Sequence, residues 1–263
     1  MASSFSTLPR SVAGLPALAY IRTAGAKQPG IVYCGGFLSN KNGTKPSALR
    51  QHLSAKGHPF VSFDYTDKGD SVDKDIATKW SMQQWKDDVL TVLDQLTEGP
   101  QILVGSSMGA WMALLAAMQR PQRVAAIVTI SASVGFTERF AKLMQTDLSD
   151  EDRARYEAGE IVHLASVHQP IPVNKRLIEE GTALNILAHE QTVPLRCPLR
   201  LLHCMADDVA PFQNSITIAE RVASTDVDVL LRKEGNHLMS TANDIQLIYN
   251  TVDSVIAMVQ TKL

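Results

Sequence analysis

Five residues near the middle of the chain, Gly105-Ser106-Ser107-Met108-Gly109, have the types and spacing of a nucleophile elbow. A serine hydroxyl becomes a useful nucleophile when a sharp strand-to-helix turn presents it beside a base and under amide donors. The apolar run Gln101–Val104 precedes the motif and the helix-prone run Ala110–Met118 follows it. Glycines at both flanks suit the close backbone approach of such a turn, where a side chain would collide. The pattern therefore predicts Ser107 as a nucleophile, although a Gly/Ser turn after a strand is common by itself.

Two later loops can supply an acid and a base. The apolar run Pro198–Cys204 leads into Asp207 and Asp208, and the run Val227–Leu231 leads into a loop that contains His237. An acid just past a strand end can stand at the upper rim of a sheet, near a serine at an elbow. Position alone leaves both Asp207 and Asp208 open as the acid. The chain order serine, aspartate, histidine is that of α/β hydrolases.

A glycine pair, Gly35-Gly36, follows the apolar run Ile31–Cys34. Such a pair lets the backbone approach a ligand and leaves the next amide, that of Phe37, free to point into a site. A simple turn is the alternative interpretation of the same residues. With the elbow present, the pair predicts one arm of an oxyanion hole, and the amide of Met108 predicts the other.

These groups form one chemical set. Ser107 needs a base to take its proton, and His237 needs a carboxylate that holds its tautomer and stabilises the imidazolium. The tetrahedral oxyanion needs amide donors, for which Phe37 and Met108 qualify. We therefore expect an acyl-enzyme on Ser107, with protonated His237 releasing the leaving group and water completing the cycle. This chemistry requires no metal and no organic cofactor.

Strands that alternate with helices predict the α/β class, with a mostly parallel, doubly wound sheet. The first apolar run is expected at the edge of the sheet and the second nearer its centre. The expected strands are 18–21, 31–34, 60–65, 101–104, 124–130, 198–204 and 227–231. The expected helices are 46–56, 81–96, the one after the elbow, 212–223 and 241–261. Trp85 falls on the apolar face of the second and is expected in the core.

The alternation breaks between about Val134 and Leu195, a charged and helix-prone stretch without a strand-like run. An insertion there lies above the carboxyl ends of the strands, where open α/β sheets bind ligands. We therefore expect a single α/β-hydrolase domain over residues 1–263 with a helical lid at about 134–195. The histidines of this stretch are expected on the surface or in packing roles: His163, His168 and His189.

Composition excludes several other classes of protein. The net charge is −2 and the charges are mixed, so no basic face exists for a nucleic acid to bind. The longest apolar stretch is too short for an integral membrane segment. Three cysteines, an odd number without metal-ligand spacing, indicate a reducing compartment and no metal site. The Ser-rich, acid-free start, residues 1–10, is compatible with a transit-peptide remnant or with a disordered tail.

Several stretches resemble a small group within the α/β-hydrolase superfamily, the mitochondrial abhydrolase-domain esterases that act as palmitoyl-protein thioesterases and mycophenolic acid acyl-glucuronide esterases. The matching stretches are Phe37–Ser39 with Asn42–Lys45, Phe63–Tyr65, Gly99–Ser107, Arg200–His203, Ser224–Val229 and Asp244–Leu247. The resemblance covers nearly the whole domain. The elbow and the order of the three residues belong to the entire superfamily, whereas Gln101–Ser107 and Ser224–Val229 are specific to the small group.

This resemblance implies a serine hydrolase that cleaves S-acyl cysteine thioesters and acyl esters such as acyl glucuronides. It also implies a mitochondrial location, with the cytoplasm as the alternative. In the group the catalytic acid lies four residues after the histidine that ends its strand, which selects Asp207 over Asp208. A general small-molecule carboxylesterase and a non-catalytic binding protein on the same fold are the alternatives. The oligomeric state stays open.

The chain also departs from the group at identifiable places. Cys204 stands where a glycine is usual, and Thr66–Asp70 replaces a more glycine-rich loop. The stretch expected to form the lid matches poorly. These departures leave Ser107, Asp207 and His237 intact, so they concern the preference for the acyl group and not the chemistry.

Overall fold

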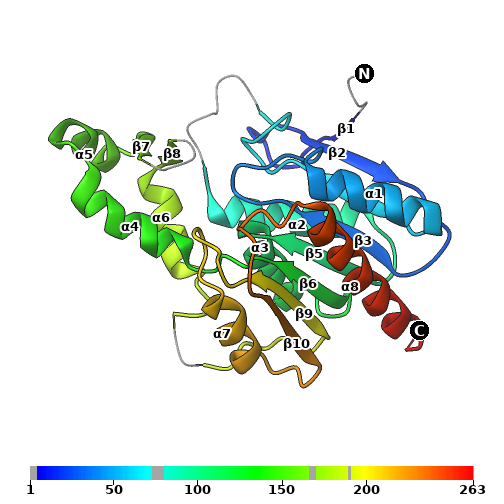
Figure 1. The fold of residues 1–263 in the computed structure, drawn as a ribbon. Helices are drawn as coiled ribbons and strands as arrows, with labels where there is room; N and C mark the ends of the chain where they lie inside the picture. The colour runs from blue at the N-terminus through cyan, green and yellow to red at the C-terminus, as the bar shows by residue number, and fades with distance from the viewer. Residues whose placement is uncertain (1–4, 73–79, 166–169, 189–190, 263) are drawn as a thin grey trace.

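The computed structural model describes residues 5–72, 80–165, 170–188 and 191–262, and within them a central sheet carries the fold (Figure 1). Its strands are β1 (Ser6–Leu8), β2 (Leu18–Thr23), β3 (Gly30–Cys34), β4 (Phe60–Phe63), β5 (Gln101–Ser106), β6 (Val124–Ile130), β9 (Leu199–Cys204) and β10 (Val227–Arg232). They lie in the order β1-β2-β4-β3-β5-β6-β9-β10. The pairs from β4 to β10 are parallel, whereas β2 is antiparallel to both β1 and β4. The predicted α/β class is confirmed.

Helices cover both faces of this sheet. The helices outside the segment between β6 and β9 are α1 (Thr44–Lys56), α2 (Met82–Leu96), α3 (Met108–Gln119), α7 (Gln213–Arg221) and α8 (Ala242–Gln260). One apolar cluster lies beneath α1 and α8, with Leu53 and Val252 fully buried. The other lies beneath α2 and α3 around Trp85 and Trp111, so the core role predicted for Trp85 is confirmed. The sheet is therefore doubly wound, because each face is buried by its own helices.

Local capping chemistry fixes the helix ends that the sequence indicated. The side chain of Ser81 accepts from the amide of Gln84 at the start of α2. Thr241 and Asp244 form a capping box at the start of α8. Gly57 ends α1 in the left-handed conformation, with φ of 83°. Within the described ranges, none of the helices combines the length and the apolar character that crossing a bilayer needs.

The segment between β6 and β9 extends to one side of the sheet (Figure 1). It contains α4 (Phe136–Asp147), α5 (Asp150–Glu157), β7 (Val162–Leu164), β8 (Ile171–Val173) and α6 (Lys175–Ala183). The prediction that this segment lacks strands is wrong, because β7 and β8 pair antiparallel. Each has three residues, too few to show an alternating pattern in the sequence. His163 is exposed on β7, as expected, while His168 and His189 lie outside the described residues.

Ser6–Leu8 form β1, and Arg10 beyond it contacts Asp88, so of the two alternatives for residues 1–10 the disordered tail does not hold for these residues. β1 pairs with β2, which is therefore not the edge strand that the sequence indicated. Beyond β1, Nη1 of Arg10 lies 2.6 Å from Oδ1 of Asp88, and both side chains are buried, at 5% and 0% exposure. Burial raises the pKa of Asp88, and the Arg10 guanidinium opposes that rise. The segment thus supplies the counter-ion of a buried acid.

We expect Arg10→Met to lower the free energy of unfolding by about 3 kcal/mol at pH 7, because Asp88 would be left as a buried, unpaired charge. The deficit relative to the parent should narrow as the pH falls, since protonation of Asp88 removes that charge. Urea unfolding at pH 7 and pH 5.5 measures both effects. Arg22→Met, which changes an exposed arginine on β2, is the matched control and should change stability by less than about 0.5 kcal/mol. Equal losses in the two variants would contradict the argument.

Candidate active site

Ser107 stands between the last residue of β5 and the first residue of α3, in a strained backbone conformation with φ of 55° and ψ of −121°. A positive φ is costly for any residue with a side chain, and it persists only where the surroundings enforce it. Here the amide of Ser107 donates to the carbonyl of Ile130 at 2.9 Å. The Ser107 carbonyl accepts from the amides of Ala110 at 3.0 Å and Ser133 at 3.2 Å. The turn is held from both sides.

The two glycines of the motif are required by close backbone contacts. A Cβ at Gly105 would lie 2.5 Å from Cα of Ala110, and a Cβ at Gly109 would lie 2.1 Å from the carbonyl oxygen of Cys34. The predicted reason for these glycines is therefore confirmed. The second contact also presses the start of α3 against the end of β3, where the chain enters the loop that contains Phe37.

His237 and Asp207 meet Ser107 at this edge of the sheet. Nε2 of His237 lies 2.8 Å from Oγ of Ser107, and its Nδ1 lies 2.8 Å from Oδ2 of Asp207. An ionised carboxylate only accepts hydrogen bonds, so Nδ1 carries the hydrogen and Nε2 is left to accept from the serine hydroxyl. The structure thus brings together the three predicted residues from loops after β5, β9 and β10.

The environment of Asp207 keeps its carboxylate charged. Its side chain is fully buried, and Oδ1 accepts from the amides of Val209 at 2.9 Å and Ala210 at 2.8 Å. Burial raises the pKa of Asp207, but the hydrogen bonds from His203, His237 and the Ala210 amide outweigh it and hold the pKa below the usual range. Asp208 is exposed to solvent, so Asp207 is the acid that faces the histidine.

His203 shapes the turn around the acid. Its Nε2 lies 3.1 Å from both Oδ2 of Asp207 and the carbonyl oxygen of Ala210. A nitrogen between two acceptors must carry the hydrogen, so Nδ1 accepts from the hydroxyl of Ser215 at 2.8 Å. This fully buried histidine therefore holds the same carboxylate oxygen that faces His237.

The loop after β3 brings a backbone amide next to the elbow. The carbonyl oxygen of Gly36 accepts from the amide of Ser39 at 3.2 Å and from its hydroxyl at 3.0 Å. The amide of Phe37 belongs to the same trans peptide and points the opposite way. Gly36 borders Ser107, since its Cβ would lie 3.4 Å from Cβ of Ser107. Within the described ranges no protein group accepts from the Phe37 amide, and Met108 opens α3, where amides lack intrahelical acceptors.

An aromatic cluster joins this loop to the segment between β6 and β9. The ring of Phe37 makes edge contacts with Phe136 and Phe140 of α4, at centroid distances of 5.4 and 5.9 Å. Phe136 also contacts Trp111 of α3 at 5.7 Å. Sequence reasoning missed this cluster, although Phe136 and Phe140 have the i, i+4 spacing of one helix face. The loop that carries the Phe37 amide is therefore packed against apolar rings of α4.

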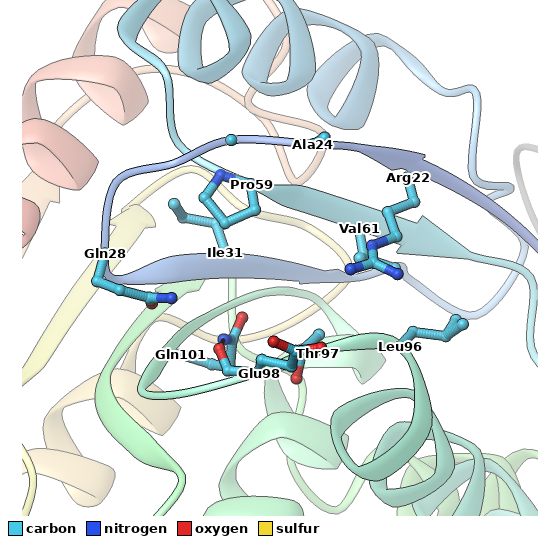
Figure 2. Close-up of a pocket in the computed structure, with 11 residues that line it drawn as sticks. Arg22, Ala24, Gln28, Ile31, Pro59, Val61, Leu96, Thr97, Glu98 and Gln101 are labelled. Carbon is cyan, nitrogen blue, oxygen red and sulfur yellow. Dashed lines mark hydrogen bonds between the residues drawn. The ribbon is translucent and has the colours of Figure 1, made fainter.

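A separate cavity of about 120 Å³ lies at the other edge of the sheet, around the starts of β3 and β5 (Figure 2). Arg22, Gln28, Thr97, Glu98 and Gln101 are among its lining residues. Ser107 follows the carboxyl end of β5, the edge at which open α/β sheets bind ligands. This cavity is therefore not part of the candidate active site.

A family profile described as alpha/beta hydrolase fold matches residues 29–209, and the chain belongs to this family. It is 39% identical over 249 residues to palmitoyl-protein thioesterase ABHD10, mitochondrial, of Bos taurus, covering 94% of this chain and 79% of the relative. The Homo sapiens protein of the same name is 37% identical over 247 residues, with the same coverage of 94% and 79%.

Solved structures agree with this assignment. Alpha/beta hydrolase domain-containing protein 10 from mouse superposes with a TM-score of 0.83 at 38% identity, covering 98% of this chain and 100% of that one. Est1E from Butyrivibrio proteoclasticus superposes with a TM-score of 0.75, covering 98% and 100%, but at 14% identity this likeness concerns the fold alone. The chain is thus a hydrolase that cleaves esters or thioesters, and the names of its relatives support a mitochondrial location. The resemblance that the sequence indicated is confirmed.

We expect Asp207→Asn to lower kcat about 10⁴-fold, because an amide in place of the carboxylate favours the wrong tautomer of His237. Asp208→Asn is the matched control, and it should leave kcat within about tenfold of the parent. Steady-state hydrolysis of an activated ester by the two variants makes the comparison. Equal losses would contradict the assignment of the acid.

Proposed function

We propose that this protein is a serine thioesterase that removes acyl groups from S-acylated cysteine, with Ser107 as nucleophile, His237 as base and Asp207 as the acid that orients it. The amides of Phe37 and Met108 form the oxyanion hole. The observation that carries this proposal is the pair of 2.8 Å hydrogen bonds linking serine, histidine and aspartate on a strained elbow. This arrangement is the one that acyl transfer by serine needs.

In the proposed reaction, Oγ of Ser107 attacks the thioester carbonyl while Nε2 of His237 takes its proton. The carbonyl oxygen becomes an oxyanion that accepts from the two amides, and the C–S bond breaks as the protonated histidine returns its proton to the sulfur. A water molecule then attacks the acyl-enzyme and loses a proton to His237. The bond between the acyl carbon and Oγ of Ser107 breaks as the protonated histidine returns its proton to Oγ, and the carboxylic acid leaves. Asp207 stays ionised and stabilises the imidazolium in both halves of the reaction.

Two observations support a long, apolar acyl group as the substrate. The relatives at 37–41% identity are named palmitoyl-protein thioesterases. The rings of Phe37, Phe136, Phe140 and Trp111 lie together near the elbow, and apolar surroundings suit a hydrocarbon chain. In this proposal residues 1–263 form one domain, and the segment at about 134–195 acts as its lid. The first candidates for lining the acyl pocket are Leu143, Met144, Ile161 and Leu164.

Oxygen esters are the second class of substrate that the same groups would accept. The oxyanion amides contact the carbonyl oxygen and not the leaving group, so an acyl glucuronide presents the same reacting carbonyl. A general carboxylesterase would show no preference between the two classes. Hydrolysis of an S-palmitoyl cysteine peptide and of an acyl glucuronide, assayed side by side, distinguishes them by kcat/KM.

We expect Ser107→Ala and His237→Ala each to lower kcat by about 10⁶-fold, as in a triad whose members act as one unit. Intact-mass measurement after treatment with a fluorophosphonate should show one adduct on the parent and none on Ser107→Ala. Ser106→Ala is the matched control and should keep both labelling and most of the activity. An adduct that survives Ser107→Ala but not Ser106→Ala would overturn the assignment, and no adduct on the parent would favour a non-catalytic binding protein.

We expect the lid to set the preference for acyl chain length. Each buried methylene contributes about 0.8 kcal/mol, so two more carbons should raise affinity roughly tenfold until the pocket is full. The measurement is kcat/KM across acyl thioesters from acetyl to palmitoyl, for the parent, Leu143→Ala and Met144→Ala. Leu230→Ala, at an exposed leucine on β10, is the control. A flat profile, or an optimum that no lid variant moves, would show that the acyl group is recognised elsewhere.

A further inference from the structure

Lys68 is a buried lysine beside the loop that carries the Phe37 amide. It follows β4 in a loop that the sequence presented as polar, yet it is only 6% exposed. Its Nζ donates a hydrogen bond to the carbonyl oxygen of Phe37. The same Nζ lies over three aromatic rings, 4.2 Å from the centroid of Phe37, 4.9 Å from that of Trp80 and 3.9 Å from that of Trp85.

The surroundings of Lys68 are unusual for a charged group. Among the described residues no carboxylate contacts it, so the faces of the three rings and one carbonyl stabilise its charge. Burial lowers the pKa of Lys68 well below its usual value. A methionine would fill the same apolar space without that desolvation cost. Packing alone therefore does not explain why an ammonium group lies here. Its one hydrogen bond, to the carbonyl oxygen of Phe37, indicates what the group does.

The backbone that carries Lys68 is rigid. Its amide donates to the carbonyl of Tyr65 at 3.0 Å, and its own carbonyl accepts from Ser71 at 2.9 Å. Nε1 of Trp85 donates to the carbonyl of Thr66 at 3.0 Å, which ties the same loop to α2. A side chain on so fixed a turn can impose a position on the group that it contacts.

Both peptides that flank the Cα of Phe37 are thereby held by side chains. Ser39 fixes the carbonyl of Gly36, and Lys68 fixes the carbonyl of Phe37. We infer, on the basis of the catalytic roles proposed above, that Lys68 is a positioning residue of the oxyanion hole. It anchors the Phe37 carbonyl, and the amide of the same residue therefore stays directed at the oxyanion. This oxyanion forms when Ser107 attacks the carbonyl group of the substrate.

The test compares Lys68→Met with the parent on p-nitrophenyl acetate and on a trifluoromethyl ketone, which forms a tetrahedral adduct with the serine. Loss of one oxyanion donor costs about 10²- to 10³-fold in kcat, so a misdirected donor should lower kcat by about 10- to 100-fold. KM should change by less than about threefold. The affinity for the ketone should fall by the same factor as kcat/KM, because both report binding of the tetrahedral state.

Lys86→Met is the matched control. Lys86 is also 6% exposed, but it lies on α2 and contacts Asp87, so its kcat should equal that of the parent within about twofold. A Lys68→Met enzyme with unchanged kcat and ketone affinity would overturn the inference, and so would a change confined to KM. If Lys68→Met does not fold, a crystal structure of the phosphonylated parent decides. The phosphonyl oxygen should lie within about 3.1 Å of the Phe37 amide nitrogen while Nζ of Lys68 stays on the Phe37 carbonyl, and any other placement would overturn the inference.

The aryl ester keeps this test separate from the choice of substrate. If the parent hydrolyses p-nitrophenyl acetate but no acyl thioester, the proposed thioesterase function fails while the Lys68 comparison stands. If thioesters are hydrolysed and Lys68→Met matches the parent, the positioning role fails while the thioesterase function stands.

Discussion

The candidate site depends on the close approach between the nucleophile elbow and the end of β3. At Gly109 the start of α3 comes so near the carbonyl of Cys34 that no Cβ would fit between them. This contact places a strained serine directly beside the loop from Gly36 to Phe37, and backbone hydrogen bonds from β6 and α3 hold the strain in place. Main-chain contacts thus place the nucleophile and bring the loop that carries the amide donor beside it, while the side chains of Ser39 and Lys68 hold that loop.

The acid and base are held in a different way, by side chains on longer loops. Asp207 accepts from four partners at once, and two of these are the rings of His203 and His237. These hydrogen bonds restrict the buried carboxylate to few orientations. Through its own hydrogen bond the carboxylate also restricts the orientation of the His237 ring, which faces Ser107. A rigid sheet edge combined with a well-ordered carboxylate gives the preorganisation that acyl transfer requires.

The sequence was sufficient for the parts of the site that follow from local rules. Apolar runs identify three strands, which are followed by Ser107, Asp207 and His237. A serine, an acid and a histidine at the same edge of a sheet predict the hydrogen-bonded arrangement that the structure shows. The strand β1 could not be predicted, because it has three residues and forms by a tertiary contact, its pairing with β2. Lys68 was missed for the same reason: a lysine in a polar loop predicts a solvated side chain until the fold brings aromatic rings around it.

The position of β1 and Arg10 also bears on how the chain can be matured. A protease that removes a leader from an imported protein leaves a new N-terminus, and the fold limits where that terminus can fall. A cut beyond Arg10 would take away both a sheet strand and the partner of buried Asp88, whose carboxylate also holds the backbone of Thr66. A mature form that begins before Ser6 keeps both features.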